Sequence, residues 1–233
     1  MTGLRSRFRA LAPAVLVSLS LAACGTVNPA TGKRDFTPFM SPGQEVQVGK
    51  ETHPQVIAEH GGVYDDPKIG GYVASVGGRL AANSEMTDYP FTFTVLNSPI
   101  VNAFALPGGY VYVTRGILAL FNDEAELASV LGHEIGHVTA RHTAKRYNQS
   151  MFAGLGGAIL GIATGSQALS QLANYGSQLY LLGYSRDQEY QSDELGIRYM
   201  TKAGYDPFAS PDMLRALLAQ DQLETLIAQR QNS

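Results

Sequence analysis

The five residues His133-Glu134-Ile135-Gly136-His137 decide how the rest of this chain of 233 residues is interpreted. Successive residues of an α-helix lie ~100° apart around its axis, so His133 and His137 face the same side, ~40° apart and one turn from each other. Two imidazoles in that relation can bind one Zn²⁺, and Glu134 beside them can reach the attacking water without binding the metal. The motif therefore predicts a helix that carries a catalytic metal site.

A catalytic zinc site needs a third protein ligand. His142 comes nine residues after His133, which on a continuous helix places it ~180° away, so we expect a structural or surface residue. The remaining histidines, His53 and His60, belong to no motif and are expected at the surface. Glu189 is the best candidate, because Asp193 follows on the same helical face and can accept the free N–H of a ligating histidine.

The segments around the motif predict a mainly helical α+β fold. Apolar spacing, capping residues and stop signals indicate helices at about 45–60, 67–83, 123–146, 187–203 and 211–228. Alternating apolar residues indicate strands at 91–96, 101–106 and 110–114, and the last two flank the turn Pro107-Gly108-Gly109 as a β-hairpin. We therefore expect a small antiparallel sheet beside the two helices that carry the metal ligands.

Three blocks of sequence, taken together, resemble one known family. They are His133–His137, Ser185-Arg186-x-x-Glu189-x-x-x-Asp193, and Asn102-Ala-Phe-Ala-Leu-Pro-Gly-Gly109. They look like the membrane-associated gluzincin family that includes HtpX, the CAAX prenyl endopeptidase and BepA-type periplasmic zinc metalloproteases, over about residues 45–220. The resemblance implies a zincin-like metalloprotease domain. It also implies His133, His137 and Glu189 as zinc ligands, Glu134 as catalytic base and Asp193 as hydrogen-bond partner of a ligand.

The resemblance also gives the strand at 101–106 a function. In zincins an edge strand passes over the metal and pairs with the substrate backbone, which here assigns Asn102, Ala103 and Phe104 to substrate binding. The same residues also fit an ordinary buried hairpin. Related enzymes carry a histidine after the last helix that stabilises the oxyanion, but no histidine follows His142 here. The alternatives in this chain are Tyr184, Tyr190, Arg186 and Arg198.

The N-terminus carries the features of an export signal. Arg5, Arg7 and Arg9 precede an apolar run from 11 to 22, which is shorter than a membrane-spanning helix. The run ends in Leu21-Ala22-Ala23-Cys24, which resembles a bacterial lipobox and implies a lipid on Cys24. We therefore predict a lipoprotein signal peptide at 1–23, a tether at 24–40 rich in Pro, Gly and Thr, and a zinc metallopeptidase domain at 41–233. Gly25, which is not Asp, points to the outer membrane.

These features predict a zinc-dependent endopeptidase. It would be lipid-anchored on the periplasmic side of the bacterial outer membrane, where it would hydrolyse unfolded or misassembled envelope proteins in possible association with the envelope assembly machinery. The alternative is a peptide-binding chaperone or assembly factor with little turnover. A net charge of −3 without a basic stripe argues against nucleic-acid binding. The Gly-rich apolar stretch 151–165 fits a buried helix, a mobile lid or a membrane-facing segment.

Overall fold

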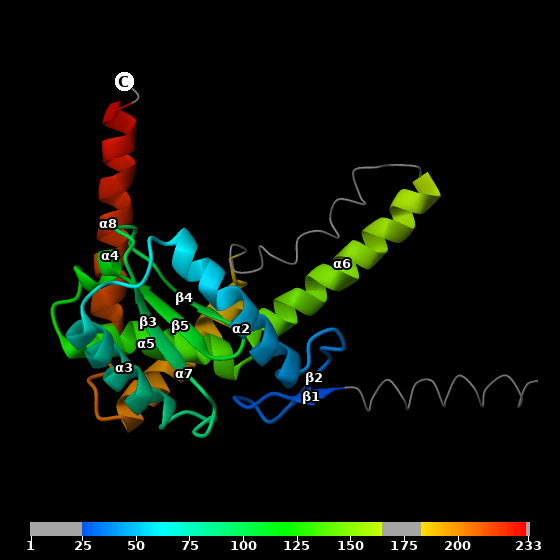
Figure 1. Cartoon of the computed structure of the whole chain (residues 1–233), viewed down its shortest axis with the longest axis horizontal. Coiled ribbons are helices and arrows are strands. Elements are labelled where there is room, and N and C mark those ends of the chain that lie inside the picture. Colours follow the sequence, from blue (N-terminus) through cyan, green and yellow to red (C-terminus); the bar gives the residue numbers. More distant parts are fainter. Residues whose placement is uncertain (1–24, 165–182, 232–233) are drawn as a thin grey trace, which may run out of the picture.

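The computed structural model describes residues 25–164 and 183–231, so the predicted signal peptide and Cys24 lie outside the described residues. The elements follow in the order β1 (Thr26–Val27), β2 (Arg34–Asp35), α2 (Pro42–Glu59), α3 (Pro67–Ala81), β3 (Thr92–Leu96), β4 (Ala103–Leu106), β5 (Tyr110–Thr114), α4 (Arg115–Leu118), α5 (Glu124–Thr139), α6 (His142–Thr164), α7 (Arg186–Lys202) and α8 (Ala209–Gln231). Helices make up most of the described chain and surround two small sheets (Figure 1), which confirms the mainly helical α+β class.

Polar side chains cap the first turns of three helices. Ser41 and Gln44 form a capping box at the start of α2, in which the Gln44 side chain accepts from the Ser41 backbone N–H at 2.8 Å. The Asp66 side chain accepts from Lys68 N at 3.0 Å at the start of α3. The Asp123 side chain accepts from Glu126 N at 2.9 Å and caps the start of α5, the helix that carries the histidine motif.

The main sheet has the strand order β3-β5-β4. β4 and β5 form the predicted antiparallel hairpin, with Ala103 opposite Val113. β3 pairs with β5 in parallel, with Thr92 opposite Tyr110, which makes the sheet mixed. Residues 97–102 carry the chain past the position of β5, so the second strand of the hairpin, and not the first, pairs with β3. Within this sheet, β4 is therefore left as an edge strand.

Helix α5 is the centre of the fold. Its apolar residues Leu127, Leu131 and Ile135 recur every four positions and are almost completely buried against the core formed by α3, the sheet and α7. Burial of each such side chain contributes about 1.5–3 kcal/mol. His133 and His137 lie on a different side of α5 and face the carboxylates of α7.

Glycines allow α5 and α7 to pack unusually closely. A Cβ on Gly196 of α7 would lie 2.8 Å from the backbone nitrogen of His133, and a Cβ on Gly136 of α5 would lie 2.8 Å from the Ser192 Oγ atom. The Ser192 hydroxyl also donates to the carbonyl oxygen of His133 at 2.6 Å. The two helices that carry the motif residues are thus held at backbone contact.

The single helix predicted for 123–146 is interrupted. α5 ends at Thr139, α6 begins at His142, and between them Arg141 adopts a left-handed backbone conformation with φ 55°. Its guanidinium is buried and holds this conformation by donating from Nε to Glu45 Oε1 at 2.7 Å and from Nη2 to the Met40 carbonyl at 3.0 Å. The strain of such a conformation, about 1–3 kcal/mol, is offset by these contacts. The chain direction therefore changes immediately before His142.

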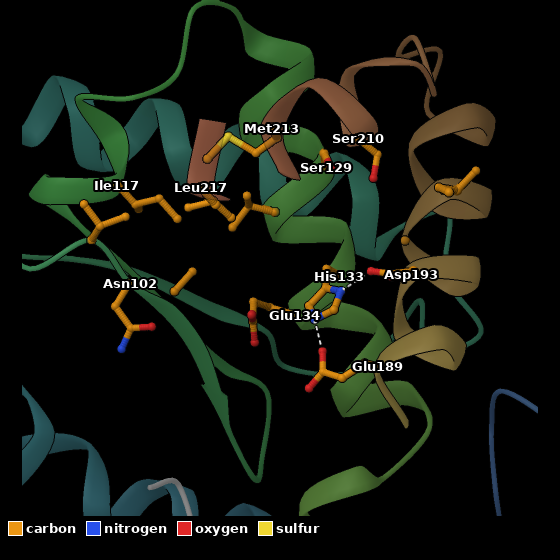
Figure 2. A pocket seen from close by; sticks show the side chains of 15 residues that line it. Asn102, Ile117, Ser129, His133, Glu134, Glu189, Asp193, Ser210, Met213 and Leu217 are labelled. Carbon is orange, nitrogen blue, oxygen red and sulfur yellow. Dashed lines mark hydrogen bonds and ion pairs between the residues drawn. The ribbon is translucent and has the colours of Figure 1, made fainter. Parts of the chain in front are cut away.

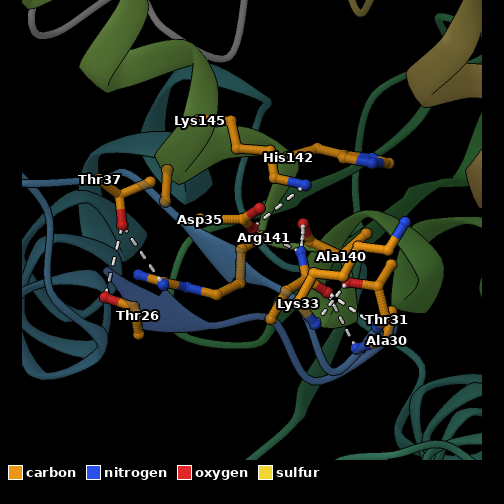
Figure 3. Close-up of polar contacts among 12 residues, drawn as sticks. Thr26, Ala30, Thr31, Lys33, Asp35, Thr37, Ala140, Arg141, His142 and Lys145 are labelled. Carbon is orange, nitrogen blue, oxygen red and sulfur yellow. Dashed lines mark hydrogen bonds and ion pairs between the residues drawn. The ribbon is translucent and has the colours of Figure 1, made fainter. Parts of the chain in front are cut away.

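The segment expected to be a tether is folded from residue 25 onward. β1 and β2 form a two-stranded hairpin that lies against the junction of α5 and α6 (Figure 3). Asn28 is fully buried there, and its side-chain amide donates to Asp35 at 2.6 Å and to the Ala140 carbonyl at 2.8 Å. Asp35 in turn forms an ion pair of 3.2 Å with Lys145. A buried Asn and an ion pair thus attach this part of the predicted tether to the domain.

Helix α6 extends away from the rest of the domain (Figure 1). It takes in the Gly-rich stretch as far as Thr164, whereas Gly165 lies outside the described residues. Phe152 is 45% exposed and contacts Phe36 and Phe39 of the N-terminal segment. None of the helices in the described ranges is both long and apolar enough to cross a membrane.

The close packing of α5 and α7 yields a stability prediction. Gly196→Ala places a methyl group against the backbone of α5, where no flexible side chain can move aside, and we expect a loss of about 1–3 kcal/mol in the free energy of unfolding. Chemical denaturation measures this value. Gly78→Ala in α3 is the matched control, since its Cβ meets nothing within 4 Å, and it should stabilise the protein by up to about 1 kcal/mol. Equal effects of the two substitutions would contradict the packing argument.

Candidate metal centre

The histidine motif brings two imidazole nitrogens together on α5. The Nε2 atoms of His133 and His137 lie 2.9 Å apart, with His137 buried and His133 half-buried. Two nitrogens that both carry a lone pair can approach this closely only when they share a proton or a cation. The one-turn spacing of the motif thus produces the convergence that the sequence predicts.

Helix α7 supplies the third donor atom. Ser185 caps this helix through a capping box with Gln188, which fixes its first turn and Glu189 within it. Glu189 Oε2 lies 3.2 Å from His133 Nε2 and 3.8 Å from His137 Nε2, and Figure 2 shows its carboxylate pointing toward the His133 ring. One ligand atom of each of the three residues lies within 4.8 Å of the others.

The donor set fits a zinc ion. Metal–ligand bonds of about 2.0–2.2 Å at tetrahedral angles place ligand atoms roughly 3.4 Å apart, and the three distances found here, 2.9, 3.2 and 3.8 Å, bracket that value. Two imidazoles and one carboxylate are also the ligand types of an open zinc site, which leaves one position free. The residues His133, His137 and Glu189 could therefore hold Zn²⁺.

Asp193 orients one of the two histidines. Its Oδ1 lies 2.7 Å from His133 Nδ1 (Figure 2), so the ring donates its Nδ1–H to the carboxylate. The Nε2 lone pair of His133 is then directed to the point where the other two ligand atoms converge. Burial opposes a charge on His133, but its hydrogen bonds with the carboxylates of Asp193 and Glu189 raise its pKa to about 10. Two carboxylates thus make this point of the molecule favourable for a cation.

Glu134 is placed beside the donors without being one of them. Its side chain is buried but lines both cavities next to His133. Burial raises the pKa of Glu134 to about 7, although the neighbouring His133 lowers it. A carboxyl group whose pKa lies near neutral pH can both accept and return a proton.

His142 contradicts the expectation of a residue on the opposite face. Because the helix breaks at Arg141, His142 is turned back onto the site, is fully buried, and has its Nδ1 2.9 Å from His137 Nδ1. Burial lowers the pKa of His142 to about 4, which keeps the ring neutral at ordinary pH. No glycine marks the break, so the sequence offers no local signal for this contact.

Two adjoining cavities flank Glu134. One of about 390 Å³ has a largely apolar wall that includes Ile117, Val130, Met213 and Leu217 (Figure 2). The other, of about 330 Å³, is bordered by His60, His137 and Tyr184. Both are lined by Asn102 and Ala103, and the second also by Phe104. The strand residues predicted to bind substrate therefore lie beside the candidate metal ligands.

The backbone of β4 has hydrogen-bonding groups directed away from β5. Thr114 N donates to Asn102 O at 3.0 Å, which makes these two residues a hydrogen-bonded pair of the antiparallel ladder. The pairs alternate, so the N–H and C=O of Ala103 and Ala105 point to the open edge of the sheet. An extended peptide could add to this edge as a further strand.

Among the four residues considered as oxyanion donors, Tyr184 borders the second cavity, next to the candidate metal ligands. Its ring stacks on His137 with 3.8 Å between centroids, and its hydroxyl lies 2.9 Å from Thr143 Oγ1. The remaining three, Tyr190, Arg186 and Arg198, line neither cavity. His60 borders the second cavity and is half-buried, although the sequence suggested a surface position, because α2 ends directly beside Phe104 of β4.

The chain is similar in sequence to known proteases. A model of peptidase family M48 matches residues 67–225. The chain is 30% identical over 190 residues to a beta-barrel assembly-enhancing protease of Escherichia coli (strain K12), an alignment that covers 78% of this chain and 39% of that protein. It is 33% identical over 186 residues to the protein of the same name from Yersinia pestis, covering 76% and 38%. It is 38% identical over 138 residues to the mitochondrial metalloendopeptidase OMA1 of Arabidopsis thaliana, covering 59% and 28%. The chain thus spans well under half the length of these relatives.

The hydrogen bond from His133 to Asp193 yields a prediction on metal binding. Asp193→Asn removes the charge that orients His133, so we expect a dissociation constant for Zn²⁺ about 10–100-fold higher, measured by competition with a chromophoric chelator. Glu194→Gln, an exposed change on the same helix, is the control and should leave the affinity unchanged. Wild-type affinity in the Asp193 variant would contradict this role.

Proposed function

The chain belongs to peptidase family M48, and on that premise we propose that it is a zinc-dependent endopeptidase. In this proposal His133, His137 and Glu189 hold the ion, Glu134 is the general base, and Asp193 orients His133. The observation that carries it is the convergence of three donor atoms within 4.8 Å of one another, next to a buried carboxyl group in a cleft bordered by an open strand edge. This combination suits hydrolysis of a peptide bond.

The chemistry divides between the ion and the protein. When bound, Zn²⁺ would supply Lewis-acid charge that polarises the scissile carbonyl and makes a water molecule acidic near neutral pH. Glu134 accepts the proton of the attacking water and later gives it to the leaving amine. Its burial favours this cycle, because the raised pKa makes both transfers feasible at the same pH. Tyr184, which borders the same cavity, is the residue best placed to donate to the developing oxyanion.

The cleft indicates how a substrate is held. The open edge of β4 would bind an extended backbone at Ala103, between Asn102 and Phe104, largely independently of sequence. The apolar wall of the larger cavity, with Ile117, Met213 and Leu217, would take an apolar side chain next to the scissile bond. Unfolded chains expose both extended backbone and apolar side chains, which supports unfolded or misassembled proteins as the substrate class.

The location of the protein is also part of the proposal. Residues 1–23 have the pattern of a lipoprotein signal peptide, and Cys24, which lies outside the described residues, would carry the lipid. Together with relatives named beta-barrel assembly-enhancing protease, this supports a site on the periplasmic side of the outer membrane and envelope proteins as substrates. In this proposal the residues that pack on the domain begin with the β1–β2 hairpin, before the boundary at residue 41 that the sequence suggested.

A chaperone or assembly factor with little turnover is the second candidate. It is favoured by the open edge of β4 beside the larger cavity, where an extended polypeptide could bind whether or not it is cleaved. Such a protein would bind unfolded polypeptides in the same cleft. It differs from a protease in that its zinc-loaded wild type would release them uncleaved.

The assignment of Glu134 is tested by Glu134→Gln. The variant should bind Zn²⁺ in the same amount as the wild type but cleave casein at least about 10²–10⁴-fold more slowly, since the proton acceptor is lost. Mass spectrometry of the wild-type products should place apolar residues beside the cleaved bonds. Glu51→Gln, an exposed change on α2, should leave the rate unchanged. Cleavage by the pure Glu134 variant at the wild-type rate would refute the mechanism, and a zinc-loaded wild type that binds casein without cleaving it would favour the chaperone.

The assignment of Cys24 is tested by Cys24→Ala in the full chain. We expect the wild type to sediment with membranes after cell lysis and the variant to appear in the soluble fraction, because the thioether to the lipid cannot form. The thermal unfolding midpoint should be the same for both, since the substitution leaves every residue from Gly25 onward unchanged. A variant that remains with the membrane would show that the lipid is not the anchor.

A further inference from the structure

The two candidate zinc ligands of α5 have different hydrogen-bond partners at Nδ1, the ring nitrogen that does not face the metal position. His133 Nδ1 contacts the carboxylate of Asp193, whereas His137 Nδ1 contacts the neutral ring of His142 at 2.9 Å. The other nitrogen of His142, Nε2, lies 2.9 Å from the amide oxygen of Gln191 on α7. His137, His142 and Gln191 thus form a chain of hydrogen bonds that ends at the candidate metal centre.

The direction of these hydrogen bonds follows from the atoms involved. An amide oxygen can only accept, so His142 donates its Nε2–H to Gln191 Oε1. The neutral His142 ring then has an unprotonated Nδ1, which can only accept. His137 must therefore donate its Nδ1–H to His142, and its Nε2 carries a lone pair directed toward His133 Nε2 and Glu189 Oε2.

The opposite arrangement would disable the ligand. If Gln191 turned its amide NH₂ group toward His142, the direction of each hydrogen bond would reverse, and the His142 ring would donate from Nδ1 to His137. The neutral His137 would then carry its proton on Nε2, where no metal could bind. The orientation of one side-chain amide on α7 thus selects the tautomer of a ligand on α5.

We propose that Gln191 and His142 are positioning residues that hold His137 in its metal-binding tautomer. This inference rests on the proposed zinc site but goes beyond its ligand set. It assigns a role to the helix break as well, because the change of chain direction at Arg141 is what brings His142 to His137. Neither Gln191 nor His142 belongs to the candidate ligand set, and neither lines the two cavities beside it.

The role is tested by removing the acceptor at Gln191. Gln191→Leu roughly keeps the size of the side chain but removes the acceptor of the His142 Nε2–H. We expect the dissociation constant for Zn²⁺, measured by chelator competition, to be about 10–100-fold higher. Gln191→Glu should restore wild-type affinity, since a carboxylate only accepts and enforces the same direction. Glu194→Leu, an exposed change on the same helix, is the control and should bind as the wild type does.

A double variant and a spectroscopic signal distinguish this role from general damage. His142→Leu should weaken binding as Gln191→Leu does, and the double variant should lose little more, because both act through His137. In zinc-loaded protein labelled with ¹⁵N-histidine, the wild-type His137 should show its proton on Nδ1. All variants are first compared by thermal unfolding to establish that they are folded.

The outcomes separate the two proposals. A wild type that binds no zinc refutes the proposed zinc site itself. A wild type that binds zinc, together with a folded Gln191→Leu variant of equal affinity, refutes the role of Gln191 and His142 alone. Failure of Gln191→Glu to restore affinity would also overturn it, since a structural defect, and not the direction of the hydrogen bonds, would then explain the loss.

Discussion

Backbone contact between α5 and α7 is the constraint on which the candidate centre depends. Helices usually pack with their axes about 8–10 Å apart, and bulky side chains at Gly132, Gly136 or Gly196 would force this pair to the wide end of that range. A donor set taken from two helices can converge on one ion only if the helices approach closely. The hydrogen bond from Ser192 to the carbonyl of His133 fixes the two helices along their axes as well. The distances between Glu189 and the two histidines are thus set by the glycines.

The N-terminal hairpin completes the break that follows α5. A helix end leaves carbonyl groups without intrahelical partners, and an abrupt break leaves them inside the protein. Here the Thr139 carbonyl accepts from Ala30 N at 3.3 Å, and the Ala140 carbonyl accepts from the Asn28 side chain at 2.8 Å. The hairpin therefore replaces the missing next turn. Without it, the turn that brings His142 to His137 would bury unsatisfied polar groups, which cost about 1–3 kcal/mol each.

The parts of the site that follow local periodicity were predictable from the sequence, and those that depend on long-range contacts were not. The shared face of His133 and His137, and that of Glu189 and Asp193, follow from the 3.6-residue repeat of a helix. The hairpin of β4 and β5 follows from its Pro-Gly-Gly turn. By contrast, the break at Arg141 depends on Glu45, which is distant in sequence, and a positive φ at an arginine has no local signature. The parallel pairing of β3 and the placement of His142 and His60 were missed for the same reason.

If the chain is anchored at Cys24, the folded hairpin sets how far the cleft can reach from that anchor. A flexible linker of sixteen residues has a root-mean-square span of about 20–24 Å, which would let a domain search a wide volume around its anchor. Gly25, however, is already held by a hydrogen bond from Arg34 to its carbonyl at 3.2 Å. If Cys24 is the attachment point, it is only one residue from Gly25, a span of at most about 3.6 Å. The domain would then work at a nearly fixed height above the bilayer, and would meet only those polypeptides that are themselves close to the membrane surface.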